Sequence, residues 1–375
     1  MKILHIYKDY APVVGGIENH IRWLAEGLAA RGHSIHVLVT NTVAHTRYDQ
    51  IDGVSVTKCA RQLNVSSAPV AFSMPLELRK VGKSADVVHL HAPYPPGELA
   101  QLLVRAGRRT VITYHSDIVK QATLLKFYAP FLRWALARAD RILVSNPPYI
   151  QSSPFLRTVA QADPGKVQVV HFGIDVDRFA APQPPKRVEQ LRRQLGGDVL
   201  ALFVGRLRYY KGVEVFLQAL AHATQVTGVI VGSGGLEQEL HARARSLDLG
   251  SRVRFAGSVP DDLLPLYYQA ADMFVLPSIH RSESLGIVLL EAMASGLPLI
   301  STELGTGTSY VNQHRRTGLV VPPRDPLALA AAMETLANDA NLRKKLGAAA
   351  QARAQAEFNI HRMVAQVEAV YESLF

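Results

Sequence analysis

Two glutamates and a glycine in the segment Ser282–Gly296 could bind a molecule that carries both phosphate and hydroxyl groups. The segment reads SESLGIVLLEAMASG, with Gly286 between Glu283 and Glu291 at the start of an apolar helical run. Free backbone N–H groups and the helix dipole at a helix start favour an anion, whereas carboxylates accept hydrogen bonds from hydroxyls. The pattern indicates a sugar-nucleotide site, with Glu283 toward the sugar and Glu291 toward the ribose. The alternative is two glutamates on the solvent side of a buried helix.

Two cations follow a predicted strand about 75 residues earlier in the chain. The segment Val199–Gly212, VLALFVGRLRYYKG, begins as an apolar run, breaks at Gly205 and then carries Arg206 and Lys211. A strand that leads into a glycine turn with two cations suits a diphosphate at the carboxyl edge of a parallel sheet. Arginine offers a planar fork and lysine a compact charge. Ordinary solvated surface charges are the alternative.

The first half of the chain offers a histidine and a glycine loop in comparable places. His115 directly follows the predicted strand Arg109–Tyr114, and Gly15 and Gly16 follow the first predicted strand. A glycine would let the backbone approach a phosphate closely. A plain strand-to-helix turn has the same glycines, and a lone histidine is more often a structural hydrogen-bonding residue. Two more histidines stand near the end of another predicted strand and are given no role: His89 and His91.

These motifs together resemble the retaining glycosyltransferases of family 4, which have the GT-B fold of two facing Rossmann-like domains. The residues that carry the resemblance are, in chain order, the glycine loop Gly15-Gly16-Ile17-Glu18, His115 in TYHSD, the cations Arg206 and Lys211, and the pair Glu283-x7-Glu291, which is similar to the family's E-x7-E motif. The motifs occur in the family's order and span essentially the whole chain.

The resemblance implies an enzyme that moves a hexosyl group from a nucleotide sugar to an acceptor with retention of anomeric configuration. The leaving phosphate itself would help to deprotonate the acceptor, so no protein general base is assigned. The implied catalytic residues are His115, Glu283, Arg206 and Lys211. The implied donor-binding residues are Gly15, Gly16, Arg206, Lys211, Val259, Glu283, Leu285, Gly286, Ile287 and Glu291. Leu285 stands where family motifs often have phenylalanine.

The segment Glu303–Asn312, ELGTGTSYVN, resembles mannosyl- and rhamnosyl-type transferases of bacterial polysaccharide assembly. It favours GDP-mannose or a related GDP-sugar as donor, with base recognition by the backbone around Ser258–Val259. Four alternatives stay open: a UDP-sugar donor, a GT-B isomerase that acts on a UDP-sugar, a catalytically silent GT-B partner subunit and a nicotinamide-dependent oxidoreductase. The last would need G-x-G-x-x-G, and Gly232-Ser233-Gly234-Gly235 lacks the final glycine at that spacing.

No metal or cofactor is expected beyond the nucleotide sugar as co-substrate. Asp175-Val176-Asp177 spells D-x-D, a metal-nucleotide signature of another glycosyltransferase fold, but it falls in the predicted linker. Asp261 and Asp262 are expected to cap a helix. Cys59 is the one cysteine, which excludes an internal disulfide and a cysteine-rich metal site and fits a reducing cytosol.

The net charge of +10 lies mainly in the first half of the chain. Up to residue 180 there are 21 Lys and Arg against 13 Asp and Glu, and beyond it 20 against 18. This basic half suits a glycan acceptor on a polyprenyl-diphosphate carrier and a peripheral contact with an anionic membrane. A candidate basic amphipathic segment holds Lys120, Lys126, Arg133 and Arg138 among Leu124, Leu125, Phe127, Tyr128, Phe131, Leu132 and Trp134. A half-buried helix with a solvated basic face is the alternative.

Other partners and locations are not expected. A zinc finger, an RNA-recognition signature and a long basic tail are absent from the sequence, so nucleic acid is not an expected partner. The first residues, MKILHIYKDYAP, predict a strand and not a signal peptide. No membrane span is expected. The predicted location is therefore the cytoplasm. A peripheral position at the inner face of the cell membrane is compatible with it.

The 375 residues suffice for two domains of ordinary size. Strand and helix patterns alternate throughout, which favours parallel sheets with helical crossovers. The Pro- and Gly-rich linker is expected at 173–185, between domains over 1–177 and 186–357. The resemblance to family 4 implies that the first domain binds the acceptor and the second the donor. It also implies that the final helix, about 358–375, returns to the first domain. Expected strands are 2–7, 34–39, 54–58, 86–91, 109–114, 141–145 and 167–170, then 200–204, 227–231, 253–256, 273–276 and 298–301.

Overall fold

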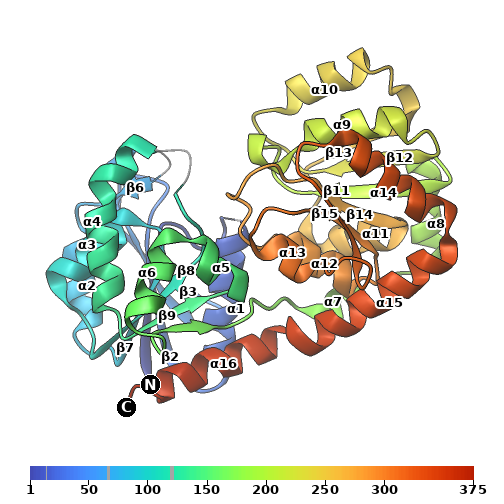
Figure 1. Ribbon diagram of the computed structural model, residues 1–375. Helices are drawn as coiled ribbons and strands as arrows, with labels where there is room; N and C mark the ends of the chain where they lie inside the picture. The colour runs from blue at the N-terminus through green and yellow to red at the C-terminus, as the bar shows by residue number, and fades with distance from the viewer. Residues whose placement is uncertain (14, 66–67, 119–121) are drawn as a thin grey trace. The chain divides into compact units, whose positions relative to one another are not determined.

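The computed structural model describes residues 1–13, 15–65, 68–118 and 122–375. The chain forms two compact units, one made of Met1–Phe172 with Ile360–Phe375 and the other of Gly173–Asn359 (Figure 1). Each unit has a parallel sheet with helices packed on it, which is the Rossmann-like architecture expected from the alternating pattern.

The first unit contains an eight-stranded sheet in the order β10-β9-β8-β7-β1-β2-β4-β3. Its pairs are parallel except for the antiparallel edge pair β3–β4. The strands are β1 (Lys2–Ile6), β2 (Ser34–Thr40), β3 (Arg47–Ile51), β4 (Val54–Cys59), β7 (Val87–Ala92), β8 (Arg109–Tyr114), β9 (Arg141–Val144) and β10 (Val167–Val169), and a separate pair is β5 (Leu63–Val65) with β6 (Ala68–Val70). The helices are α1 (Gly16–Ala30), α2 (Met74–Gly82), α3 (Pro95–Val104), α4 (Ala122–Arg138), α5 (Pro147–Ser152), α6 (Pro154–Ala162) and α16 (Ile360–Glu372).

The second unit contains a six-stranded, fully parallel sheet in the order β13-β12-β11-β14-β15-β16. The strands are β11 (Val199–Val204), β12 (Val226–Val231), β13 (Val253–Gly257), β14 (Met273–Leu276), β15 (Leu299–Thr302) and β16 (Gly318–Val321). The helices are α7 (Val176–Ala180), α8 (Pro185–Leu195), α9 (Val213–His222), α10 (Glu237–Ser246), α11 (Leu264–Ala270), α12 (Ile287–Ala294), α13 (Gly307–Val311), α14 (Pro326–Asn338) and α15 (Ala340–Glu357).

The first unit ends at Phe172, five residues before the predicted boundary at 177. The segment expected to be a linker belongs to the second unit, because Ile174 pairs with Asn359 and donates its N–H to Phe358 O at 2.9 Å. Phe179 in α7 is buried against the ring of Tyr268. Proline and glycine in this segment therefore mark turns around a short packed helix and not a free connection.

The last helix, α16, packs on α1 inside the first unit, and the N and C marks lie together there in Figure 1. Glu368 accepts from His33 Nε2 and from Arg31 Nε, at 2.6 and 2.7 Å. A Cβ atom at Gly27 would lie 2.6 Å from a methyl carbon of Val364, so glycine lets the two helices approach. The end of the chain thus completes the core around its beginning.

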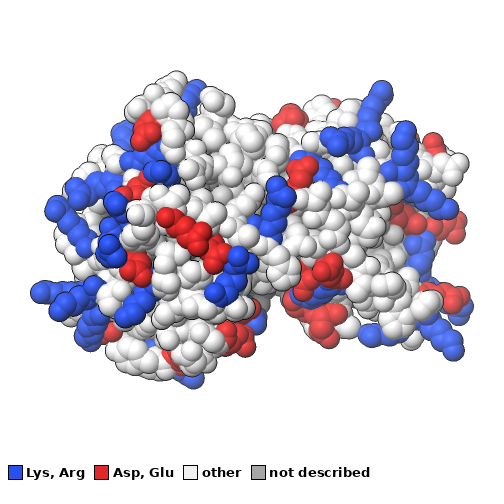
Figure 2. All heavy atoms as spheres, turned by 90° about the horizontal axis from the view of Figure 1, so that it is seen from below, with Lys and Arg blue, Asp and Glu red and all other residues white. Residues whose placement is uncertain are grey.

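Surface features bear on the expected partners. Within the described ranges the structure contains no helix long and apolar enough to cross a bilayer. Figure 2 shows one face, on which Lys and Arg side chains are interspersed with Asp and Glu side chains. In α4, Lys126, Arg133 and Arg138 are exposed. Of the predicted amphipathic segment, Lys120 lies outside the described residues, as do the side chains of Leu124 and Leu125.

Candidate active site

The strand order of the second sheet reverses between β11 and β14. Doubly wound sheets bind their ligands at such a switch point. Strands β12 and β13 extend the sheet on one side of this point, and β15 and β16 extend it on the other. The loops that follow β11 and β14 meet closely, since a Cβ atom at Gly212 would lie 2.0 Å from the carbonyl oxygen of Pro277. Gly212 also has φ of 68°, a left-handed backbone that favours glycine.

Lys211 and Glu283 form a buried ion pair at this switch point. Lys211 Nζ lies 2.6 Å from Glu283 Oε2, and the two side chains are 10% and 9% exposed. Burial by itself would lower the pKa of the Lys211 ammonium, but the Glu283 carboxylate outweighs it, so the pKa lies above its ordinary value. The site therefore holds a permanent positive charge beside the carboxylate that the sequence placed toward the sugar.

Two neighbouring loops hold Glu283 in place. Ser278 Oγ donates to Glu283 Oε2 at 3.0 Å, and Thr306 Oγ1 donates to the Glu283 carbonyl at 2.8 Å. The N–H of Gly307 donates to Ser284 O at 2.7 Å, so α13 begins directly against the Glu283 loop. Ser278, after β14, thus holds the Glu283 carboxylate, while residues after β15 hold the backbone of its loop.

Gly286 immediately precedes α12 and has φ of 79°, in the left-handed region that favours glycine. A Cβ atom there would also lie 2.7 Å from a methyl carbon of Leu276. One turn further on, the Glu291 carboxyl accepts from Tyr268 OH at 2.7 Å and is 9% exposed. Burial raises the pKa of Glu291 to about 7, and the Tyr268 hydrogen bond opposes part of that rise.

The remaining predicted residues of the second unit occupy the same loops. Arg206 is exposed after β11, Val259 is half-buried after β13, Leu285 is 2% exposed, and Ile287 is the first residue of α12. A Cβ atom added at Gly205 would lie 3.7 Å from Lys211 Nζ, so the glycine turn is close to the lysine. The predicted donor residues of this unit therefore lie in loops that follow its strands and in the helix α12.

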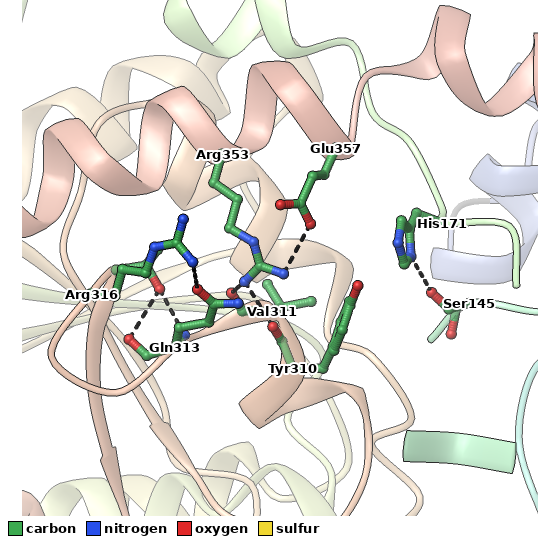
Figure 3. A network of polar contacts seen from close by, with 9 residues as sticks. Ser145, His171, Tyr310, Val311, Gln313, Arg316, Arg353 and Glu357 are labelled. Atoms are coloured by element: carbon green, nitrogen blue, oxygen red, sulfur yellow. Dashed lines mark hydrogen bonds and ion pairs between the residues drawn. The ribbon is translucent and has the colours of Figure 1, made fainter. Parts of the chain in front are cut away.

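Arg353 of α15 supports the opposite end of α13 (Figure 3). Its guanidinium donates to the carbonyls of Tyr310 and Val311, at 2.8 and 2.6 Å, and to Glu357 at 3.0 Å. Its side chain is 4% exposed. Because the other end of α13 contacts the backbone of the Glu283 loop, Arg353 connects α15 to that loop through α13.

Replacing Arg353 with methionine is expected to destabilise the second unit by about 3 kcal/mol, because two buried carbonyls and Glu357 lose a charged donor. Thermal unfolding followed by circular dichroism would show a midpoint lower by roughly 6–12 °C. Arg316→Met is the matched control, since Arg316 is exposed and donates to the Gln313 side chain at 2.8 Å. Equal midpoints for the two variants would contradict a supporting role for Arg353.

The first sheet has its own switch point, between β1 and β7. Histidines gather beside it on one face of the sheet. Because side chains alternate along a strand, the register His5↔His89 and His91↔Thr113 puts the strand histidines on one side. We call the following set the histidine cluster: His5, His20, His89, His91 and His115, all 0–2% exposed.

Two separate hydrogen-bond chains run through the histidine cluster. In one, His91 Nε2 lies 3.1 Å from His5 Nδ1, and His91 Nδ1 lies 3.0 Å from His115 Nε2. In the other, His89 joins Tyr371 OH at 2.5 Å and Thr113 Oγ1 at 2.7 Å. Burial lowers the pKa of every ring, to about 3 for His5 and His20. The rings are therefore neutral, and each carries a single N–H.

The glycine loop follows β1 at the same edge of the sheet. Gly15 precedes α1 with φ of −178°, which is extended backbone, so its type is not required by conformation. Glu18 in the first turn of α1 lies 3.8 Å from Lys8 Nζ. A cavity of about 550 Å³ opens beside this loop, lined largely by apolar and aromatic side chains that include Ile17, Phe127 and Tyr128.

The aspartates of the D-x-D sequence and the pair Asp261–Asp262 differ in whether they cap a helix. In the D-x-D sequence, Asp175 caps α7 by accepting from Arg178 N, and Asp177 accepts from Gln355 Nε2 at 3.3 Å. The expectation that Asp261 caps a helix is wrong. Asp261 instead begins a 3₁₀ turn and pairs with Arg178 Nη1 at 2.8 Å, while α11 begins only at Leu264.

Several residues that structure the candidate sites of the two units were given no role by reasoning from the sequence. They are Ser278, Thr306, Tyr268 and Arg353 in the second unit and His5, His20 and His91 in the first. The one available signal was the H-x-H pattern of β7, in which alternate residues of a buried strand are both histidine. The others act through contacts between elements that are far apart in the chain, which no local sequence pattern reveals.

Comparisons with known proteins agree with this geometry. Residues 14–178 match the family model "Glycosyltransferase Family 4", and residues 188–353 match "Glycosyl transferases group 1". The chain is 39% identical to D-rhamnosyltransferase WbpZ of Pseudomonas aeruginosa over 94% of this chain and 91% of that protein. It is 35% identical to O-antigen chain mannosyltransferase C of Escherichia coli over 100% of this chain and 99% of that protein.

Solved structures show the same fold at lower sequence identity. Sucrose-phosphate synthase from Thermosynechococcus elongatus superposes with a TM-score of 0.83 at 23% identity, covering 100% of this chain and 99% of that one. Anabaena Alr3699/HepE in complex with UDP gives 0.81 at 21% identity, covering all of both chains. With two relatives above 30% identity over nearly their full lengths, the chain belongs to the glycosyltransferases that combine a Family 4 domain with a group 1 domain in the GT-B fold.

Proposed function

We propose that this glycosyltransferase moves a mannosyl-type hexose from a GDP-sugar to a growing glycan and retains the anomeric configuration. The observation that carries the proposal is the buried Lys211–Glu283 pair at the switch point of the second sheet. It offers one charge suited to a phosphate and one suited to sugar hydroxyls. The names of the two relatives, a D-rhamnosyltransferase and an O-antigen mannosyltransferase, favour this class of sugar.

Each residue of the second unit has a distinct task in this proposal. Negative charge builds on the leaving diphosphate as its bond to the sugar breaks, and Lys211 and Arg206 stabilise that charge. The N–H groups at the start of α12, near Ile287, add to it. Glu283 binds the sugar hydroxyls and fixes the ring, while Glu291 accepts from the ribose hydroxyls.

Retention follows from displacement on a single face of the sugar. The acceptor oxygen bonds to the anomeric carbon on the side from which the phosphate oxygen departs, and the acceptor's proton passes to that phosphate oxygen. The nucleoside diphosphate is released. No protein base is needed, and the ammonium of Lys211 stays protonated beside Glu283. His115 of the first unit binds a sugar hydroxyl.

The acceptor is proposed to be a glycan on a polyprenyl-diphosphate carrier. The apolar cavity next to Ile17 suits the carrier's lipid, and α4 exposes Phe127, Phe131 and Trp134 beside basic side chains. Such a face fits an anionic membrane surface. Recovery of all the protein in the soluble fraction of cells, unchanged at low and high salt, would contradict the membrane contact.

Nucleotide-sugar affinity should depend on the protonation of Glu291. Because the pKa of Glu291 is raised to about 7, the carboxylate form that accepts two hydroxyls is lost as the pH falls through 7. From pH 8 to pH 6 the Kd for GDP-mannose should rise about tenfold. Tyr268→Phe removes a hydrogen bond to the carboxylate and should move this transition to higher pH. The same pH dependence in Glu291→Gln would exclude Glu291 as its source.

Calorimetric titration of the purified protein with GDP-mannose, UDP-glucose, UDP-N-acetylglucosamine and NADH tests the donor. We expect GDP-mannose to bind and Arg206→Ala to weaken it. Binding of a UDP-sugar alone would keep the transferase and remove the GDP assignment. Binding of none would favour a silent subunit, and product formed from donor alone would reveal an isomerase. Turnover is expected to persist in excess chelator, and its recovery only on adding a divalent ion would overturn the metal-independent proposal.

A further inference from the structure

His115 stands at the end of a hydrogen-bonded row of imidazoles, and the row has a direction. A neutral imidazole has one N–H donor and one bare nitrogen, so each ring in the row His5–His91–His115 must donate on one side and accept on the other. Two arrangements satisfy both contacts. Either every ring donates toward His115, or every ring donates toward His5. The two arrangements leave opposite groups at the two ends.

The ends of the row differ in their surroundings. His5 Nε2 and His115 Nδ1 are both buried and have no hydrogen-bond partner among the described residues. His5 lies in the middle of β1 at 0% exposure, whereas His115 follows β8 at the carboxyl edge of the sheet. Either arrangement leaves one of these two nitrogens as an N–H without a partner among the described residues, which is costly unless a ligand satisfies it. Ligands bind at the carboxyl edge of such a sheet, where His115 lies, and not at the middle of β1. The bare nitrogen therefore belongs at His5 and the N–H at the edge.

From this we infer that His5 and His91 are positioning residues that set the tautomer of His115, so that its Nδ1–H is the donor offered to a substrate oxygen. His5 Nδ1–H donates to His91 Nε2, and His91 Nδ1–H donates to His115 Nε2. The N–H of His115 then has no partner within the described part of the protein. A sugar hydroxyl or phosphate oxygen reaching it would recover a hydrogen bond that the free protein lacks.

This inference rests on the proposed function for its biological meaning. Under that function His115 holds a substrate oxygen by donation and does not remove a proton from it. His20 encloses the row from α1, with its ring 5.2 Å from that of His115. His89 lies in the same cluster, but Tyr371 and Thr113 occupy both of its nitrogens, so it is outside the row.

The direct test is the tautomer of His115 in the free protein. Long-range proton–nitrogen correlation spectra of histidine-labelled protein, with His115 assigned through His115→Gln, should show Nδ1 protonated and Nε2 bare. An Nε2–H tautomer would overturn the inference. His89→Asn is the matched control, because it removes a ring of the same burial and should leave the His115 signals unchanged. This measurement needs no substrate, so it stands apart from any failure of the proposed function.

Two substitutions at His5 test the direction of the row. The amide of His5→Asn can still donate to His91, so it should preserve the Nδ1–H tautomer and keep kcat within about threefold. The carboxylate of His5→Asp can only accept, which forces every ring to reverse and leaves His115 Nδ1 bare. We expect the reversed tautomer, a fall in kcat of at least about 100-fold and unchanged affinity for GDP, which lacks the sugar that His115 is proposed to bind.

Folding of both variants is checked by their unfolding midpoints. If His5→Asp fails to fold, His91→Gln serves in its place, since loss of the middle ring should leave His115 in mixed tautomers. Retention of the wild-type tautomer in His5→Asp or His91→Gln would contradict control by the row. Addition of Zn²⁺ tests a further possibility. A metal held by His20, His91 and His115 would remove the proton signal of the His91–His115 hydrogen bond and overturn the inference.

Discussion

Lys211→Met is expected to lower kcat by about 10³-fold, because the leaving diphosphate loses the buried cation that stabilises it. Glu283→Gln should also lower kcat, through weaker bonds to the donor sugar, with a smaller effect on nucleotide affinity. Steady-state kinetics with GDP-mannose and calorimetry on the same preparations separate the two effects. Arg245→Met, on the exposed side of α10, is the matched control for loss of a positive charge.

The pair also allows catalysis to be separated from stability. Each single change leaves a buried charge without its partner and should cost about 3–5 kcal/mol of unfolding free energy. The double change Lys211→Met with Glu283→Gln removes both charges, so stability should recover while activity does not. Full activity in either single variant would show that the pair is structural. Recovery of activity in the double variant would show the same.

Acid should unfold the first unit before the second. Burial holds the pKa values of all five rings of the histidine cluster below the ordinary value near 6.5, so the unfolded chain binds protons that the folded chain refuses. Stability is therefore full above about pH 7 and falls as the pH drops below 6.5. At pH 5 each ring costs up to about 2 kcal/mol and the five together up to about 10, as large as the whole stability of a typical domain.

Urea titrations from pH 8 to pH 5, followed by tyrosine fluorescence and circular dichroism, measure this loss. His20→Leu is the informative variant, because both nitrogens of His20 are buried without a partner among the described residues. The unfolding of this variant should take up one proton fewer as the pH falls. Its unfolding free energy at pH 5 should be about 2 kcal/mol higher than that of the wild type. A pH dependence identical to that of the wild type would show that His20 is not held neutral by burial.

Strands buried on both faces were the easiest elements to predict. Every residue of β12 and β7 is buried, so each strand is a short, largely apolar run in the sequence, which predicts a buried strand. The edge strand β3, RYDQI, is half exposed and polar, and its pairing with β4 depends on a hairpin that no apolar pattern reveals. Strands β5, β6 and β16 were missed as well. β5 is exposed throughout and β6 contains a proline, so neither shows a buried apolar run.

The candidate site divides in the same way. Gly286 could be predicted because a helix start with a left-handed residue needs glycine. The contact of Lys211 with Glu283 could not, since it depends on β11 and β14 being neighbours although three helices and two strands separate them in the chain. The row from His5 to His115 likewise depends on the register of β1 against β7, which is set by the whole sheet.

The position of α16 has a consequence for how the protein is made. Residues 360–375 complete the core of the first unit, where Tyr371 is fully buried against His89. During vectorial synthesis on the ribosome, residues 1–172 emerge long before this helix exists, while residues 173–359 can form their own unit without it. The half of the protein that is translated first should therefore be the half that matures last. Until then its unfilled surface is a natural binding site for chaperones.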